Sequence, residues 1–381
     1  MSGPLNGIRV VDMTRALAGP YATLMLADAG ADVLKIERPG VGDDTRGWGP
    51  PFLRPPDDGE PQSTYYLSVN RNKRSVALDL KDPDHLQRLH RLVAEADVLA
   101  ENFRPGVMDR LGLGTADLER LNERLVVLSI TGFGEGGPQG HRPGFDQIVQ
   151  GEAGLMSFTG PEGGSPTKAG MPISDILAGM FGAYGVAAAL VEREHTGKGQ
   201  RVTTSLLASS VAVHTFQGTR WLLGNHVPTP EGNRHPSIAP YGAYDVADGM
   251  IIVAVGSEGL WRRFAPLVGV DPDDPRFVSN GDRVDNRDDL DAAMAPALTA
   301  ATVDAWIDRL DTAGIPAGRV RALDEVYANP QIEHLGMIDE VEHPTLGPLR
   351  LPGNPLQFGR SKRDDPRPPP LLDEHSDDWL D

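Results

Sequence analysis

Two short apolar stretches near the N-terminus, Ile8-Arg-Val-Val-Asp-Met13 and Asp32-Val-Leu-Lys-Ile-Glu37, determine the predicted fold. Aliphatic and β-branched residues dominate both, which is typical of buried strands. Residues 20–29 between them predict a helix, and Gly30 follows as a C-cap residue that tolerates a left-handed backbone. Strand, helix and strand in this order form a β-α-β unit, the building block of parallel sheets.

The following residues repeat the alternation of strand and helix. A helix is expected at 85–94, strands at 97–101 and 124–129, and a short helix around Arg110. This order predicts an α/β fold with a mostly parallel sheet that is covered by helices on both faces. A dinucleotide-binding domain is excluded because the turn Thr14-Arg-Ala-Leu-Ala-Gly-Pro20 lacks the G-x-G-x-x-G glycines that admit a pyrophosphate.

The composition changes after Gly224, which indicates a second domain. Residues 225–240 are polar and rich in proline, and they predict a linker between a large domain (1–224) and a smaller α+β domain (241–328). Residues 329–381 form a C-terminal segment. Strands are expected at 242–246, 250–255, 337–341 and 349–351, and helices at 206–223, 259–268, 287–300 and 302–313.

The composition limits the possible partners. A net charge of −18 disfavours nucleic acid and anionic membranes, so neither is expected as a partner. The chain has no cysteine, and with the scattered histidines this predicts no metal site and fits a reducing cytoplasm. The N-terminus shows no signal-peptide pattern, which also predicts a cytoplasmic protein. The apolar run at 176–191 is shorter than the roughly 20 residues of a membrane span and predicts a buried helix.

The stretch Gly170-Met-Pro-Ile-Ser-Asp-Ile-Leu-Ala-Gly179 carries the best candidate for covalent chemistry. Ser174 or Asp175 can cap the helix that follows by accepting hydrogen bonds from its first N–H groups. Alternatively, Asp175 is a carboxylate nucleophile whose ionised form the helix dipole favours, and its attack on an acyl carbonyl would give an anhydride. The serine-hydrolase elbow and the P-loop are absent from the sequence.

Two further segments favour an anionic ligand. The segment Asn70-Arg-Asn-Lys-Arg-Ser-Val-Ala-Leu-Asp-Leu-Lys81 has four cations and one carboxylate. It is consistent with a phosphate-binding patch, and equally with a solvated strand edge. The glycine-rich loop Gly132-Phe-Gly-Glu-Gly-Gly-Pro138 follows a predicted strand, and open α/β sheets bind ligands at such strand ends.

Several motifs occur in a characteristic order along nearly the whole chain. They are Asp12-Met-Thr14 with Ala18-Gly-Pro20, Lys35-Ile-Glu-Arg-Pro39, Asn72-Lys-Arg-Ser75 with Leu78-Asp-Leu-Lys81, Glu101-Asn-Phe-Arg-Pro-Gly106 and Thr196-Gly-Lys-Gly-Gln200. Together they resemble the family III CoA-transferases, which include formyl-CoA transferase, carnitine CoA-transferase and the 2-methylacyl-CoA racemases. The resemblance implies a Rossmann-like large domain, a small domain, a tail that returns to the large domain, and a homodimer of interlocked chains.

The resemblance also implies roles for single residues. Asp175 matches the catalytic aspartate of the family, which goes beyond a role as helix cap. Coenzyme A thioesters are the implied substrates, with no permanently bound cofactor, and the acyl end lies toward the interdomain cleft. The backbone at Ala16 and Leu17 matches positions near the thioester. The positions that match contacts to the nucleotide end of CoA are Arg38, Leu78, Asp79, Lys81, Asn102, Phe103, Arg104 and Arg110.

The implied reaction is a double displacement that moves CoA from an acyl-CoA donor to a free carboxylic acid. Asp175 forms an acyl anhydride and then an aspartyl-CoA thioester, and the acceptor acid reverses these steps. Neither ATP nor a metal is required, because one thioester replaces another. The glycine-rich loop, with Gly134 at its centre, is the candidate source of backbone donors to the oxyanions.

Two other functions compete with transfer. A racemase needs acid/base groups on both faces of the α-carbon, and the family's racemases carry a histidine where this chain has Phe145, before Asp146. A phenyl ring carries no proton, which disfavours racemisation. Phe145 is interpreted either as a core residue at a helix start or as part of the pocket wall. The second competitor is a non-enzymatic acyl-CoA-binding protein in which Asp175 is only a helix cap.

The linker suggests the class of acid. Formyl-CoA transferases carry a long glycine-rich flap there, whereas this chain has the short stretch Gly232-Asn-Arg-His-Pro-Ser-Ile-Ala-Pro-Tyr241. Arg234 and His235 either hold the linker in place or pair with the distal carboxylate of a substrate. The second interpretation predicts a short-chain dicarboxylate, with succinyl-CoA as the candidate donor.

Overall fold

The computed structural model describes residues 3–361 and 364–375. The chain divides into two compact units. Unit 1 comprises residues 1–156, 168–226 and 330–381, and unit 2 comprises residues 157–167 and 227–329. The sequence places 157–167 in the large domain, whereas the structure groups this segment with unit 2. Residues 362–363 and 376–381 of the predicted C-terminal segment lie outside the described residues.

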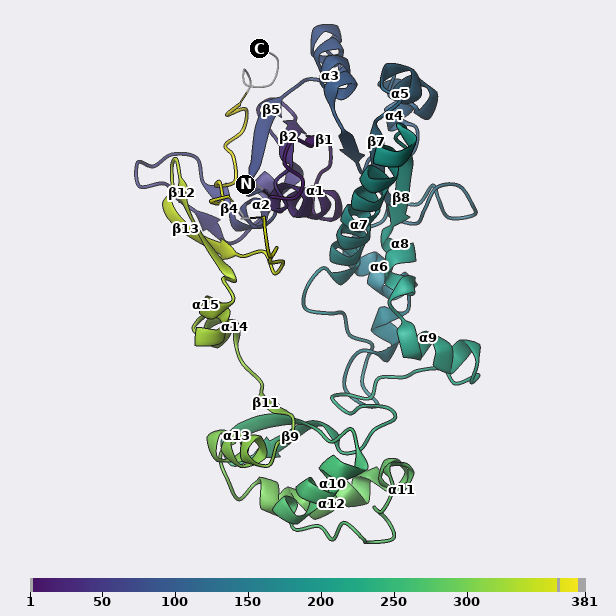
Figure 1. Cartoon of the computed structure of the whole chain (residues 1–381), viewed down its shortest axis with the longest axis vertical. Helices are drawn as coiled ribbons and strands as arrows, with labels where there is room; N and C mark the ends of the chain where they lie inside the picture. The colour runs from purple at the N-terminus through teal and green to yellow at the C-terminus, as the bar shows by residue number, and fades with distance from the viewer. Residues whose placement is uncertain (1–2, 362–363, 376–381) are drawn as a thin grey trace. The chain divides into compact units, whose positions relative to one another are not determined.

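Six parallel strands form the central sheet of unit 1 (Figure 1). The strand order matches the 3-2-1-4-5-6 order of doubly wound sheets. The predicted α/β fold with a mostly parallel sheet is therefore confirmed. In spatial order the strands are β5 (Lys73–Ala77), β2 (Asp32–Glu37), β1 (Arg9–Asp12), β6 (Val98–Glu101), β7 (Val126–Thr131) and β8 (Arg201–Ser205).

Helices cover both faces of this sheet because successive strand residues point to opposite sides. Val10 packs in one hydrophobic cluster with α1 (Ala18–Asp28) and α7 (Ile173–Thr196). Its neighbour Val11 packs in another cluster with α3 (Pro83–Glu95) and α5 (Thr115–Leu121). Figure 1 shows α1 and α7 together on one side of the sheet. The helices of the other face are α3 (Pro83–Glu95) and α5 (Thr115–Leu121).

The long helix α7 differs from its prediction. It has 24 residues and begins at Ile173, so by length and hydropathy alone it could cross a membrane. Its glycines instead allow close packing inside unit 1. A Cβ atom at Gly179 would lie 2.7 Å from the carbonyl oxygen of Ala18, and one at Gly185 would lie 2.6 Å from Cγ1 of Val202. One face of α7 is therefore a core face that rests on α1 and β8.

Smaller elements complete unit 1. The single helix predicted at 206–223 is two helices, 206–212 and 215–222, and the second begins at Thr215 with a φ of 45°. The C-terminal segment packs beside β5, where His375 N–H donates to the Ser75 carbonyl oxygen. These elements are η1 (Asp44–Gly47), β3 (Phe52–Leu53), β4 (Gln62–Ser63), α2 (Thr64–Ser68), α4 (Val107–Arg110), α6 (Asp146–Glu152), α8 (Leu206–Ala212), α9 (Thr215–Leu222), α15 (Pro330–His334), β12 (Ile338–His343) and β13 (Gly347–Pro352). The short helix η2 (Leu155–Phe158) crosses the boundary between unit 1 and unit 2.

Unit 2 is built on a three-stranded antiparallel sheet. Its own core contains the fully buried Trp261, Phe264 and Trp306. The sequence predicts both long strands and the main helices, but it predicts no element at residues 280–285, 317–319 and 323–327, where the structure has a helix, a strand and a further helix. The elements are β9 (Tyr241–Val246), β10 (Gly249–Ala254), α10 (Glu258–Phe264), η3 (Ala265–Val268), α11 (Asn280–Asp285), α12 (Arg287–Leu298), α13 (Val303–Thr312), β11 (Ala317–Arg319) and α14 (Leu323–Tyr327).

Candidate active site

A cavity of about 690 Å³ lies in unit 1 where β1 and β6 end. The loops after these strands leave the sheet toward opposite faces, and ligands of doubly wound proteins bind at this reversal of strand order. The cavity also reaches the starts of α6 and α7. The predicted site residues that line it are Ala16, Leu17, Asn102, Phe103, Arg104, Phe145, Asp146 and Asp175.

Asp175 lies in the first turn of α7, and Asp146 caps that turn. One carboxylate oxygen of Asp146, Oδ1, accepts from the backbone N–H of Ser174 at 2.8 Å and of Asp175 at 3.5 Å. Its other oxygen accepts from Nε2 of the buried Gln150 at 2.7 Å. One interpretation of the sequence makes Ser174 or Asp175 the helix cap. This interpretation is wrong, because α7 already begins at Ile173 and a carboxylate from α6 accepts from the N–H groups of both residues. The Asp175 side chain faces the cavity instead.

The two carboxylates influence each other electrostatically. Burial and the negative charge of Asp146 raise the pKa of Asp175 from its ordinary value to about 7. The sequence-based expectation is that the helix dipole favours the ionised form. In the structure, desolvation and the neighbouring charge of Asp146 instead favour the protonated form. Asp175 is thus a carboxyl group that changes its charge near neutral pH.

The other predicted CoA-binding residues follow the carboxyl ends of neighbouring strands. Arg38 comes directly after β2, and Leu78 directly after β5. Leu78 is buried, whereas Asp79, Lys81 and Arg110 are exposed. The guanidinium of Arg38 pairs with Asp44 at 2.5 Å. These predicted residues follow the carboxyl edge of the sheet, and none of them lines the cavity.

Asn102 fixes the loop after β1 to the loop after β6. Its Oδ1 accepts from the backbone N–H of Arg15 at 2.9 Å, and its Nδ2 donates to the Arg15 carbonyl oxygen at 2.7 Å. The Arg15 guanidinium lies 5.3 Å from the ring centre of Phe103. Both walls of the cavity are therefore joined through side chains that the sequence motifs identify.

The interpretation of residues 70–81 as a phosphate-binding patch is wrong for three of its four cations. Lys73 is buried and pairs with Asp12, Arg71 is buried between Asp28 and Asp339, and Arg74 pairs with Asp32. These cations neutralise carboxylates inside the fold. The interpretation as a solvated strand edge is also wrong, because β5 is bordered by β2 on one side and by the C-terminal segment on the other.

The glycine-rich loop and Phe145 are also placed by the structure. Gly132 lines the cavity, whereas Gly134 donates its N–H to Oγ1 of Thr131 at 3.0 Å. The oxyanion role of Gly134 stays a prediction. Phe145 is 60% exposed and lines the cavity, so its interpretation as a core residue is wrong.

Arg234 and His235 belong to unit 2, where both have partners. The Arg234 guanidinium pairs with Glu162, Asp288 and Asp291 at 3.2, 3.0 and 2.7 Å. The His235 ring stacks on Tyr241 with ring centres 5.0 Å apart. These contacts match the interpretation that the two residues hold their own segment in place, and a role in substrate recognition stays a prediction.

The structure adds cavity residues that sequence reasoning missed. Trp48 and Tyr65 line the cavity and pack edge to face at 5.2 Å. Burial and the charges of Asp175 and Asp146 raise the pKa of Tyr65 to about 12, which indicates that the phenol is close to both carboxylates. Lys168 also lines the cavity. No spacing pattern marks these residues, because they come from loops and from a five-residue helix.

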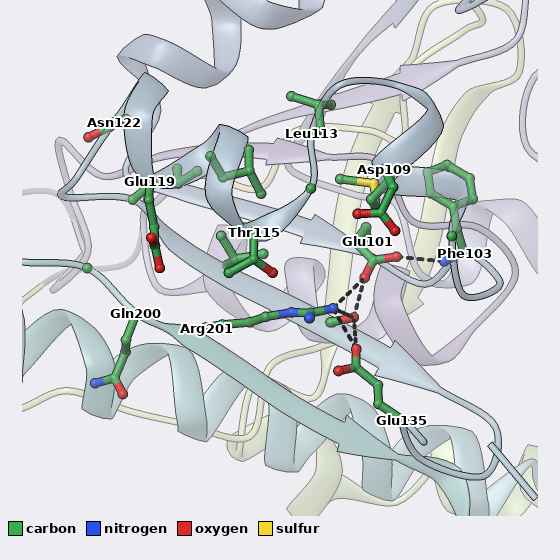
Figure 2. Close-up of a pocket in the computed structure, with 18 of the residues that line it drawn as sticks. Glu101, Phe103, Asp109, Leu113, Thr115, Glu119, Asn122, Glu135, Gln200 and Arg201 are labelled. Carbon is green, nitrogen blue, oxygen red and sulfur yellow. Dashed lines mark hydrogen bonds and ion pairs between the residues drawn. The ribbon is translucent and has the colours of Figure 1, made fainter. Parts of the chain in front are cut away.

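A second, smaller cavity of about 150 Å³ lies beside the first, and Phe103 and Arg104 line both. Figure 2 shows Arg201 pointing toward Glu101 and Glu135 in it. The buried Glu101 accepts from the N–H of Phe103 at 2.8 Å, so this cluster supports the wall of the first cavity. Among residues 3–361 and 364–375, no three His, Cys, Asp or Glu side chains are grouped to hold a metal ion.

Comparison with known proteins assigns this combination of fold and site to a family. The family model of the CoA-transferase family III matches residues 5–376. The chain is 38% identical to the succinyl-CoA:glutarate CoA-transferase of Mus musculus, over 98% of this chain and 85% of that one. It is 40% identical to the acetyl-CoA:oxalate CoA-transferase of Acetobacter aceti, over 98% and 94%. A CAIB/BAIF family protein from Brucella suis superposes with a TM-score of 0.88 at 36% identity, over 99% and 98%.

The sheet is doubly wound, and a cavity lined by Asp146 and Asp175 lies where its strand order reverses. The relatives that match nearly the whole chain are CoA-transferases. Together these findings define a transferase that acts on acyl-CoA. The chain belongs to the family III CoA-transferases. The resemblance inferred from the sequence motifs is therefore confirmed.

The raised pKa of Asp175 predicts a pH dependence of CoA transfer. In the mechanism that the sequence resemblance implies, the ionised carboxylate attacks, so kcat/KM should rise with pH and level off above about pH 7. In Asp146→Asn the rise should shift to lower pH by roughly one unit, because a negative charge beside Asp175 is removed. The measurement is a profile of kcat/KM against pH. Asp117→Asn, an α5 carboxylate outside the cavity, is the control. The assignment would be contradicted if the midpoint of the profile lay near the ordinary pKa of Asp and did not change in Asp146→Asn.

Proposed function

We propose that this CoA-transferase uses Asp175 as its nucleophile and transfers CoA between short-chain dicarboxylic acids, with succinyl-CoA as the donor. The proposal is carried by the position of the Asp175 carboxylate in the cavity at the ends of β1 and β6, next to Asp146. The two relatives described above, whose names include succinyl-CoA with glutarate and acetyl-CoA with oxalate, support a dicarboxylic substrate.

The reaction begins with attack of an Asp175 carboxylate oxygen on the thioester carbonyl. The C–S bond breaks, CoA leaves as a thiolate, and an acyl-aspartyl anhydride remains. The thiolate then attacks the aspartyl carbonyl, which releases the donor acid and leaves an aspartyl-CoA thioester. The acceptor carboxylate attacks this thioester, and the thiolate finally attacks the acyl carbonyl of the second anhydride. This regenerates the Asp175 carboxylate, and protons are neither gained nor lost overall.

The pKa of Asp175 suits these steps. A carboxylate with a pKa near 7 is a stronger base, and so a better nucleophile, than an ordinary Asp, while a large fraction is still ionised at neutral pH. Asp146 contributes through its charge and through the cap that fixes the first turn of α7.

The nucleotide end of CoA is placed along the carboxyl edge of the sheet. Residues after β5, β2 and β6 line up there because parallel strands end at the same edge. Arg38 and Arg110 supply positive charge for the phosphates. Asp44 pairs with Arg38 at present, and a phosphate would compete with this carboxylate for the guanidinium.

A racemase is less well supported. Racemisation requires a proton donor and acceptor across the α-carbon, and the exposed phenyl ring of Phe145 occupies the cavity wall where the family's racemases carry histidine. A binding module without catalysis would not need a carboxylate whose pKa is raised to about 7 in the cavity.

Lys168 is a second candidate for reading the distal carboxylate, in addition to Arg234. It lines the cavity of Asp175, and its ammonium donates to the carbonyl oxygen of Ala169 at 3.2 Å. The buried Gln150 accepts from the N–H of Ala169 at 2.9 Å and donates to Asp146. This bridge fixes the backbone beside Lys168 relative to Asp146. The three carboxylates around Arg234 would have to be displaced before it bound a substrate.

The proposal includes the interlocked homodimer that the sequence resemblance implies. Large apolar side chains are exposed on two helices of unit 1, namely Met180, Phe181 and Tyr184 on α7 and Trp221 and Leu222 on α9. An apolar surface of this kind favours a protein partner over water. A second copy of the chain is the partner that we propose.

Asp175→Asn should lower kcat by at least about 1,000-fold while CoA still binds, because the amide keeps the size of the side chain but cannot form the anhydride. Wild-type protein mixed with donor should gain a hydroxylamine-sensitive adduct on the peptide that contains Asp175, detected by mass spectrometry. The variant should lack this adduct. Turnover that persists in Asp175→Asn, or an adduct on another peptide, would refute the assignment.

Arg38→Ala and Arg110→Ala should each raise KM for CoA thioesters about tenfold and change kcat little, because phosphate contacts far from the thioester bind substrate and transition state alike. A donor of pantetheine length lacks the nucleotide and should show no such change. Arg262→Ala removes an exposed guanidinium in unit 2 and serves as the control. An equal loss with both donors would contradict the placement.

Succinyl-CoA should exceed butyryl-CoA in kcat/KM by roughly tenfold or more, because a cation pairs with the second carboxylate. Lys168→Met should remove most of this difference by slowing succinyl-CoA alone, since both donors share the CoA moiety. Arg234→Met tests the alternative reader in the same assay. Equal rates for the two donors would rule out recognition of a dicarboxylate, and an effect of Arg234→Met alone would assign the role to Arg234.

A further inference from the structure

The loop after β1 forms a wall of the Asp175 cavity without internal backbone hydrogen bonds among residues 14–16. Instead, side chains from outside the loop bind its backbone. Asp12 accepts from Thr14 N–H at 2.9 Å, and Asn102 binds both backbone groups of Arg15. Ala16 has a φ of 67°, in the left-handed region that non-glycine residues seldom adopt. The loop therefore depends on these side chains for its conformation.

Two of the side chains that hold the loop form a buried ion pair. Nζ of Lys35 lies 2.8 Å from Oδ2 of Asp43, and both side chains are at most 1% exposed. Lys35 also donates to the Thr14 carbonyl oxygen at 2.8 Å. Asp43 accepts from the Ala16 N–H at 3.2 Å and from the N–H and Oγ1 of Thr45 at 2.9 and 2.8 Å. The pair thus binds the backbone of the loop at Thr14 and at Ala16, on both sides of Arg15.

Both members of the pair stay charged in the fold. Burial alone would lower the pKa of Lys35, but the carboxylates of Asp43, Asp12 and Glu37 raise it above its ordinary value. Burial alone would likewise raise the pKa of Asp43, but Lys35 and the Thr45 hydrogen bonds lower it. A buried ion pair is seldom more stable than well-packed apolar side chains of the same volume. Stability alone therefore does not account for these two charges under a cavity wall.

We propose that Asp43 is a positioning residue for CoA transfer. Its hydrogen bond from the Ala16 N–H, with its charge balanced by Lys35, holds residues 14–17 in the conformation that forms the thioester side of the Asp175 cavity. This inference rests on the proposed function, because the resemblance alone places Ala16 and Leu17 near the thioester. The structure adds that Ala16 and Leu17 line the same cavity as Asp175. A displaced loop would misplace the thioester relative to the carboxylate, and small errors in such geometry reduce the rate strongly.

Two double variants separate the hydrogen-bond role of Asp43 from its charge. In Lys35→Met with Asp43→Asn, the charges are removed together, and the amide oxygen still accepts from Ala16 and Thr45. In Lys35→Met with Asp43→Leu, the volume is similar but the acceptor is lost. Asp28→Asn breaks the buried pair with Arg71 and serves as a control for general loss of stability, because neither residue lines the cavity.

Two readouts test the proposal. Hydrogen exchange of the peptide that contains residues 14–17 should be at least about tenfold faster with Leu at position 43, and close to wild type with Asn. With Leu, kcat should fall by roughly 10- to 100-fold while KM for the CoA thioester changes less than about threefold. The Asn variant should restore most of kcat, and Asp28→Asn should leave kcat unchanged.

The outcomes distinguish this inference from the proposed function. Equal exchange rates in both double variants would overturn the positioning role. Faster exchange with unchanged kcat would overturn its catalytic consequence. If wild-type protein transfers no CoA but the exchange rates differ as expected, the proposed function fails and the structural role of Asp43 stands.

Discussion

The reversal of strand order between β1 and β6 is the constraint on which the site depends. Chain connections leave these two neighbouring strands toward opposite faces of the sheet, so their loops diverge and leave a cavity at the carboxyl edge. The first turn of α7 reaches the same edge because the helix packs across the sheet through its glycines. Asp175 is therefore brought to the cavity by the topology and not by a local sequence motif.

The carboxylate of Asp146 beside Asp175 costs electrostatic free energy and raises the pKa of Asp175. Two negative charges in a partly buried site repel each other, and this raises the pKa of Asp175. Asp146 offsets part of its own cost by accepting from two N–H groups of α7 and from Gln150. The same carboxylate thus fixes the first turn of α7 and raises the pKa of Asp175.

The sequence predicts the sheet well and the electrostatics poorly, for physical reasons. Apolar periodicity identifies β1 and β2 because burial is a local signal. The resemblance places Ala16 near the thioester that Asp175 would attack, and the structure lines one cavity with both residues. Asn102, which the resemblance assigns to the nucleotide end of CoA, lines the same cavity. By contrast, whether a cation faces solvent or a buried carboxylate depends on contacts distant in sequence. Lys73 finds its partner Asp12 across the sheet, and no spacing rule reveals this pair.

The use of cations inside the fold explains how so acidic a protein can accept an anionic substrate. Lys35 and Lys73 neutralise Asp43 and Asp12 beneath the cavity, so these buried carboxylates add little negative potential there. The positive charges left at the carboxyl edge are few and lie on exposed arginines such as Arg104 and Arg110. With a net charge of −18, long-range attraction contributes little to substrate capture. The CoA binding that we propose therefore relies on short-range contacts at the strand ends.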